Sequence, residues 1–145
     1  TSSAFQHNGT IPLKYTCDGE DISPPLSISG VSEGTKSLVL IMDDPDAPVG
    51  TWDHWVVWNI NPATKEITEN SVPSGSVEGK TSSGQNRYGG PCPPSGTHRY
   101  FFKFYALDTI LDLSPGSTKK EVEKAMEEHV LDKTELIGLY ERTGR

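Results

Sequence analysis

Three stretches of the chain carry the apolar, β-branched and aromatic residues that predict strands. Residues 37–43 (SLVLIMD) form a nearly continuous apolar run, which is typical of a strand buried on both faces. Residues 54–60 (HWVVWNI) and 98–107 (HRYFFKFYAL) are rich in the types that strands favour. The first strand must end at residues 44–48 (DPDAP), because proline cannot donate to a sheet and restricts the residue before it.

One segment near the C-terminus has helical spacing instead. Thr118 and Glu121 have capping-box spacing directly after Pro115-Gly116. Residues 135–142 (ELIGLYER) then predict a closing strand. Residues 62–97 predict a long irregular loop, and loops of that length are usually functional or mobile. The apolar face expected for the helix comprises Val122, Ala125, Met126, His129 and Val130.

Composition agrees with a β-rich fold. Gly (14) and Pro (11) make up 25 of 145 residues, which favours many short strands joined by turns over a helical bundle. A length of 145 residues suits one domain. We therefore expect a mostly β chain with one or two short helices, forming a single domain over residues 1–145.

The charge balance excludes some classes of partner. A net charge of −7 disfavours nucleic-acid binding and stable docking on anionic membranes. No apolar run approaches the roughly 20 residues that span a bilayer, and no leading signal is visible. A cytoplasmic location is the favoured expectation. A secreted or periplasmic protein that has lost its signal is the alternative, because the chain begins at Thr1.

The chain has two cysteines, Cys17 and Cys92, too few for a disulfide scaffold or a four-cysteine zinc site. Two unrelated free thiols are the simpler interpretation. One disulfide between distant segments is the alternative, and the sequence leaves the choice open.

Acidic residues are distributed unevenly. Residues 79–107 contain no Asp or Glu, but they hold Lys80, Arg87, Arg99 and Lys103 together with His98. An acidic protein with one cationic stretch can accept a small anion there without attracting polyanions in general.

Within this stretch, residues 88–100 (YGGPCPPSGTHRY) join a Gly/Pro loop to the start of a strand. Glycines let a backbone approach a ligand and present N–H groups to it. Because alternate strand residues share a face, His98 and Tyr100 lie opposite Arg99 and resemble the wall of a pocket.

The turn after the first strand supplies a second set of candidates. Asp44 and Asp46 flank Pro45, and an Asp side chain next to a proline also commonly caps its own backbone. His54 begins the next strand, so simple alternation pairs it with Val56 and Trp58. Taken alone, such a histidine is more simply a partly buried structural residue.

In combination these motifs are more specific. Asp44-Pro-Asp-Ala-Pro48, the Trp-Asp-His-Trp-Val-Val run around His54, Gly90-Pro91 and His98-Arg-Tyr100 closely resemble the phosphatidylethanolamine-binding protein (Raf kinase inhibitor protein) family. The bacterial and archaeal branch is the nearest match, and the resemblance covers nearly the whole chain. It implies a β-sandwich-like fold with a small surface pocket for phosphate-type groups, including phospholipid head groups. Matched residue by residue, the pocket would comprise Asp44, Asp46, Trp52, His54, Gly90, Pro91, Cys92, His98 and Tyr100.

The function implied is binding of a small anion, such as phosphate or a phosphoethanolamine-like group, without catalysis, cofactor or metal. Two imidazoles, the Tyr100 hydroxyl and backbone N–H groups would supply the donors. A nearby carboxylate would fix the imidazole tautomers. We expect affinity to rise as pH falls and His54 and His98 take up protons. Cys92 stands where animal relatives have a second proline, so the lining differs there. The resemblance also permits a homodimer and regulation of a protein kinase or serine protease.

Catalytic alternatives have weaker support. Residues 75–81 (GSVEGKT) are one residue short of a phosphate-binding P-loop and follow Pro73 instead of a strand. No Gly-x-Ser-x-Gly elbow occurs. Cys92 with His98 or His54 is a candidate thiol–imidazole pair.

Two further alternatives remain. His54, His98 and Asp44 or Asp46 are suitable metal ligands by type, but no short ligand spacing supports a metal site. The alternative function is a protein-interaction module that inhibits a serine protease or kinase independently of the pocket. Residues 62–97 are where an inhibitory loop would lie.

Overall fold

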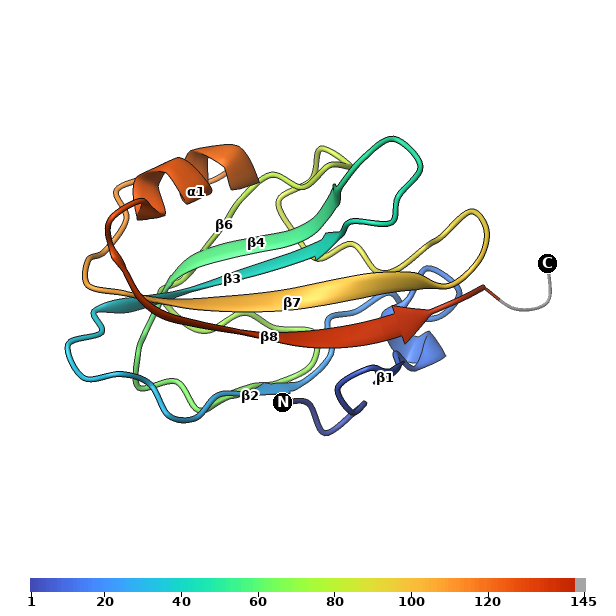
Figure 1. Ribbon diagram of the computed structural model, residues 1–145, viewed down its shortest axis with the longest axis horizontal. Helices are drawn as coiled ribbons and strands as arrows, with labels where there is room; N and C mark the ends of the chain where they lie inside the picture. Colours follow the sequence, from blue (N-terminus) through green and yellow to red (C-terminus); the bar gives the residue numbers. More distant parts are fainter. Residues whose placement is uncertain (143–145) are drawn as a thin grey trace.

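The computed structural model describes residues 1–142. Its main element is a six-stranded sheet in the order β1-β8-β7-β3-β4-β6, and a smaller sheet pairs β2 with β5 (Figure 1). Among the described strands only β1 and β8 pair in parallel. The elements are β1 (Gly9–Thr10), η1 (Leu13–Tyr15, a 3-10 turn), β2 (Leu26–Ser27), β3 (Ser37–Asp44), β4 (Trp52–Ile60), β5 (Glu66–Ile67), β6 (Val77–Glu78), β7 (His98–Leu107), α1 (Lys119–Met126) and β8 (Val130–Tyr140). The predicted mostly β fold is confirmed.

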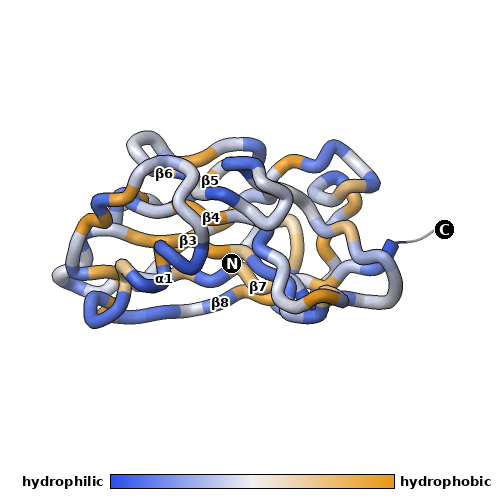
Figure 2. The backbone as a smooth tube through the Cα atoms, turned by 90° about the horizontal axis from the view of Figure 1, so that it is seen from above, coloured by the Kyte–Doolittle hydropathy of each residue, from blue (hydrophilic) through white to orange (hydrophobic). Residues whose placement is uncertain are grey.

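Strand β3 is buried along its whole length because both faces of the sheet are covered there. Leu40 and Met42 point into the larger core, which also contains Phe102 of β7. Val39 and Ile41 point the other way, into a smaller core beneath α1. This burial on both sides explains the continuous apolar run in the sequence. Figure 2 shows the hydrophobic positions gathered along β3, β4 and β7, with more hydrophilic segments around them.

Helix α1 begins with the predicted capping box. Thr118 Oγ1 accepts the Glu121 N–H at 3.3 Å, and the Thr118 N–H donates to Glu121 Oε1 at 3.0 Å. The helix is shorter than its apolar pattern indicated, since it ends at Met126. The prediction that His129 and Val130 continue its face is wrong: Glu128 adopts a φ of 67°, and Val130 already begins β8.

The closing strand starts earlier than predicted and ends at Tyr140 instead of Arg142. Residues 130–135 are all exposed, so they show none of the alternation that marks a half-buried strand. Main-chain pairing with β7 over almost the whole strand, from Val130 opposite Leu107 onward, keeps them extended. In the part of the chain that the structure describes, no helix has the length and apolar character required to cross a membrane.

Candidate functional site

A cavity of about 980 Å³ opens at the end of the main sheet where β3 ends and β4 and β7 begin. Residues from 17–23 and 81–94 form its other walls. The two candidate segments therefore meet at one concavity. Of the nine predicted residues, seven line it: Asp44, Trp52, His54, Gly90, Cys92, His98 and Tyr100. Asp46 and Pro91 are not among the lining residues.

His98 and Asp44, which both line the cavity, form a buried pair. His98 Nδ1 lies 2.6 Å from Asp44 Oδ2, and the two side chains are only 8% and 4% exposed. The carboxylate therefore fixes the orientation of the ring and favours the tautomer with the proton on Nδ1. Nε2 is the ring nitrogen that this pairing leaves for a ligand.

His54 reaches the cavity because β4 contains a bulge. The register passes from Met42 opposite Trp55 to Asp43 opposite Asp53, so His54 is an extra residue in its strand. A bulge of this kind redirects side chains, and bulges are common beside functional sites.

The bulge separates His54 from the residues that simple alternation had paired with it. Val56 and Trp58 pack in the core beneath α1. The His54 ring instead meets Tyr100 edge-on, with 5.3 Å between ring centroids, so the alternation prediction is wrong. His54 Nδ1 lies 2.7 Å from the Gly89 carbonyl, to which it donates. Burial lowers the pKa of His54, while the Gly89 hydrogen bond acts in the opposite direction.

Tyr100 lies between the two imidazoles. Its ring stacks on that of His98 with 6.4 Å between centroids. Its hydroxyl is fully buried and makes no hydrogen bond of standard geometry within residues 1–142. Burial, followed by the nearby Asp44 carboxylate, raises the pKa of Tyr100, so the hydroxyl keeps its proton and remains a donor.

Asp46 and Pro91 have structural roles instead. Asp46 accepts hydrogen bonds from the Arg99 backbone N–H at 2.9 Å and from the Arg99 guanidinium at 2.8 and 2.9 Å. This pairing lowers the pKa of Asp46 to about 2. The Pro91 carbonyl accepts the Cys17 N–H at 3.1 Å.

The glycine N–H groups are not free to donate to a ligand, contrary to the sequence-based expectation. The Gly89 N–H donates to the His54 carbonyl at 2.9 Å. The Gly90 N–H donates to Asp21 Oδ1 at 2.7 Å. These two glycines therefore shape the wall and orient His54.

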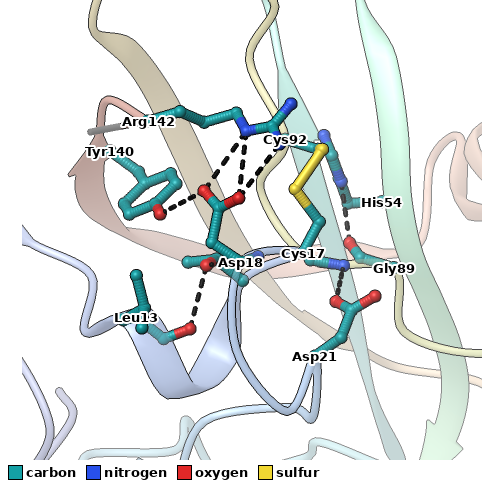
Figure 3. Close-up of a disulfide and its surroundings, with 11 residues drawn as sticks. Leu13, Cys17, Asp18, Asp21, His54, Gly89, Cys92, Tyr140 and Arg142 are labelled. Carbon is teal, nitrogen blue, oxygen red and sulfur yellow. Dashed lines mark hydrogen bonds and ion pairs between the residues drawn. A yellow bond between two sulfur atoms is a disulfide. The ribbon is translucent and has the colours of Figure 1, made fainter. Parts of the chain in front are cut away.

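Cys17 and Cys92 form a disulfide, which settles the question left open by the sequence. Figure 3 shows the bridge beside His54 and Gly89, with Asp21 on the same side of the site. Both cysteines line the cavity. The interpretation as two free thiols is wrong, because the fold brings residues 75 positions apart to a Cα–Cα distance of 5.4 Å.

The cavity is more acidic than the sequence indicated. Of the cationic residues in segment 79–107, only Arg87 lines it. Arg99 binds Asp46, and Lys103 binds Asp43 at 3.0 Å. The carboxylates that sequence reasoning missed at the cavity are Glu20, Asp21, Asp53 and Glu78. Glu20, Asp21 and Asp53 lie in stretches that resemble a known family, residues 14–26 and 52–57, but nothing there marked them as pocket residues.

A family model for phosphatidylethanolamine-binding proteins matches residues 1–141. The chain belongs to the phosphatidylethanolamine-binding protein family. It is 58% identical to a protein named UPF0098 protein from Methanothermobacter thermautotrophicus, over 96% of this chain and 95% of that one. A Pyrococcus horikoshii relative, UPF0098 protein PH1269, is 55% identical over 97% of this chain and 75% of its own length.

Solved structures from this family have the same fold. CT736 of Chlamydia trachomatis, described as a phosphatidylethanolamine-binding protein homologue, superposes with a TM-score of 0.94 at 44% identity, covering 98% and 95% of the two chains. YbcL of Escherichia coli, described as a member of the mammalian family, gives a TM-score of 0.91 at 31% identity, covering 98% and 96%. Both the fold and the family predicted from the sequence are therefore confirmed.

A metal site in this member of the phosphatidylethanolamine-binding protein family would need several His, Cys, Asp or Glu ligands close together. Over residues 1–142, no three His, Cys, Asp or Glu side chains are grouped as a metal ion would require. His54 and His98 hydrogen-bond to Gly89 and Asp44, and these contacts orient both rings.

Proposed function

We propose that the cavity binds small phosphate-type anions, such as phospholipid head groups, without catalysing a reaction on them. One observation carries the proposal: the Nδ1 atoms of His98 and His54 are engaged by Asp44 and Gly89, whereas no hydrogen bond among the described residues uses either Nε2. Both histidines line one cavity together with Tyr100, whose hydroxyl keeps its proton. Protonated imidazoles and a phenol are the donors that an oxyanion needs.

The carboxylates of the cavity narrow the class of ligand. Glu20, Asp21 and Glu78 would repel a bare anion and attract a cation. A ligand with an ammonium group next to its phosphate suits both parts of the cavity. Phosphoethanolamine is therefore the probe that tests the proposal most directly.

The absence of catalysis is supported by the state of Cys92. Its sulfur is bonded to Cys17, so the thiol–imidazole pair considered from the sequence is not available in the disulfide form. Phosphoethanolamine incubated with the protein should give no phosphorus NMR signal of a new compound, and any turnover would contradict this part of the proposal.

The contribution of the buried pair is tested by two aspartate variants. Asp44→Asn removes the carboxylate that orients the His98 ring. We expect it to weaken phosphoethanolamine binding about tenfold or more, because hydrogen bonds to charged groups contribute ~1.5–3 kcal/mol. Asp46→Asn is the matched control, since Asp46 binds Arg99 and does not line the cavity. Isothermal titration of both variants measures the effect, and equal affinities would contradict the proposed site.

Anion binding should also depend on pH. Because burial lowers the pKa of His54, its ring stays neutral at neutral pH and presents a lone pair at Nε2. Affinity should therefore increase as pH falls below about 6.5, the ordinary histidine value. Without ligand, the same shift lowers the free energy of unfolding over that range, because the unfolded chain binds the proton more tightly.

Sulfate is the appropriate probe for this pH dependence, because its own charge does not change between pH 8 and pH 5. NMR titrations across that range give the dissociation constant directly. A constant sulfate affinity would contradict a role for imidazole protonation.

A further inference from the structure

The disulfide joins two segments that form walls of the same cavity. Cys17 belongs to the wall at residues 17–23, and Cys92 belongs to the loop at residues 88–94. Cys92 is exposed and Cys17 is half-buried, so solvent reaches the bridge. Exposed disulfides are the ones that thiols reduce most readily.

Two hydrogen bonds join these segments alongside the disulfide, and a third joins Tyr88 to Tyr15, which precedes the first segment. The Cys17 N–H donates to the Pro91 carbonyl at 3.1 Å, and the Gly90 N–H donates to Asp21 at 2.7 Å. The Tyr88 hydroxyl donates to the Tyr15 carbonyl at 2.7 Å. After reduction of the disulfide, these hydrogen bonds would keep the two segments near each other but would allow them to move.

The loop that carries Cys92 also positions a ligand-binding histidine. Gly89 lies three residues before Cys92. Its carbonyl accepts a hydrogen bond from His54 Nδ1, and its N–H donates to the His54 carbonyl. Figure 3 shows the bridge close to Gly89 and His54, with the hydrogen bond between the His54 ring and Gly89 drawn. A displacement of residues 89–92 would therefore change the orientation of the imidazole.

We infer that the Cys17–Cys92 disulfide is a redox switch on the cavity, and this inference rests on the proposed function. In the oxidised form the walls are fixed and the site is preorganised. Reduction loosens residues 17–21 from residues 89–92 and weakens binding of the anionic ligand, while the rest of the fold persists.

The chemistry is a thiol–disulfide exchange with a dithiol. One thiolate of the dithiol attacks a sulfur of the bridge, and the mixed disulfide that forms is resolved by the second thiol. The dithiol leaves as a disulfide, having lost two electrons and two protons. Cys17 and Cys92 each gain one electron and one proton.

The ordering of the wall gives the switch its direction. A loosened wall must be ordered again when the ligand binds, and this cost lowers affinity. Because linkage is reciprocal, bound ligand should protect the bridge from reduction by the same factor.

The test compares the full chain in its oxidised form and after treatment with dithiothreitol, with alkylation and mass spectrometry to confirm the thiol count. We expect an unchanged far-UV circular dichroism spectrum and faster hydrogen exchange at the Gly90 and Cys17 amides, relative to Val39 in β3. Phosphoethanolamine affinity should fall about five- to tenfold, a usual size for coupling between sites, and return on reoxidation. Cys17→Ser/Cys92→Ser, treated identically, controls for effects of the reductant itself.

The outcomes separate the two proposals. If the oxidised and reduced forms bind phosphoethanolamine equally, the switch is overturned and the proposed function stands. Reduction that occurs only with global unfolding also overturns the switch. If neither form binds, the proposed function is overturned. The hydrogen-exchange rates of the Gly90 and Cys17 amides then test the switch separately, and equal rates in the oxidised and reduced forms overturn the loosening of the wall as well.

Discussion

Replacing Gly90 with alanine should destabilise the protein by about 3 kcal/mol, at the upper end of the usual cost of overpacking. A Cβ atom at this position would lie 2.3 Å from Asp21 Oδ1 and 2.6 Å from the Tyr15 carbonyl oxygen. The Tyr15 contact is with backbone, which cannot rotate away. The wall would have to separate, and the Gly90 N–H would lose its bond to Asp21. Urea unfolding gives the change in the free energy of unfolding.

Gly89→Ala is the matched control for this substitution. The nearest atom to a Cβ at Gly89 is the His54 carbonyl oxygen, 3.9 Å away, which is ordinary contact. Its backbone is also outside the left-handed region, so alanine should change stability by less than about 0.5 kcal/mol. Equal effects at the two glycines would contradict the close packing described for Gly90. We also expect Gly90→Ala to lose phosphoethanolamine binding, because the displaced loop no longer positions His54.

The long strands could be predicted because their burial requires apolar residues, which are visible in the sequence. Both faces of β3 are covered, and its continuous apolar run reports this directly. β5 and β6 have two residues each, too few to show a period. The first six residues of β8 are exposed and depend on pairing with β7 alone. Their position is fixed by contacts far away in the sequence, which local patterns do not contain.

The end of α1 was missed for a related reason. Helices commonly end at a glycine in the left-handed region, and no glycine follows Met126 until Gly138. Here Glu128 adopts the positive φ instead. Val130 stands at helical spacing from Met126 in the sequence, but a turn after the helix places it at the start of β8.

The site illustrates what strand alternation can and cannot predict. For His98 and Tyr100 it was correct, because β7 is regular at its start. For His54 it failed, because a bulge reverses the face and leaves no mark in the sequence. The family resemblance placed His54 in the pocket regardless. The same resemblance included Asp46, whose side chain binds Arg99 instead.

Removing both cysteines, in Cys17→Ser/Cys92→Ser, should lower the free energy of unfolding by about 2–4 kcal/mol. The bridge closes a loop with a sequence separation of 75 residues. A cross-link over such a long loop restricts the unfolded chain strongly, so its loss favours unfolding. Domains of this size have total stabilities of roughly 5–15 kcal/mol, so the variant should still be folded at room temperature.

Guanidinium unfolding of the variant, next to the oxidised protein with and without dithiothreitol, measures this contribution. The reduced protein and the double variant should unfold at similar denaturant concentrations, because both lack the same cross-link. Reduction should leave the double variant unchanged. If the oxidised protein were no more stable than the variant, strain that the bridge imposes on the folded state would offset the entropy that it removes from the unfolded state. The rigid wall that orients His54 would then have to come from the Gly90–Asp21 and Cys17–Pro91 hydrogen bonds alone.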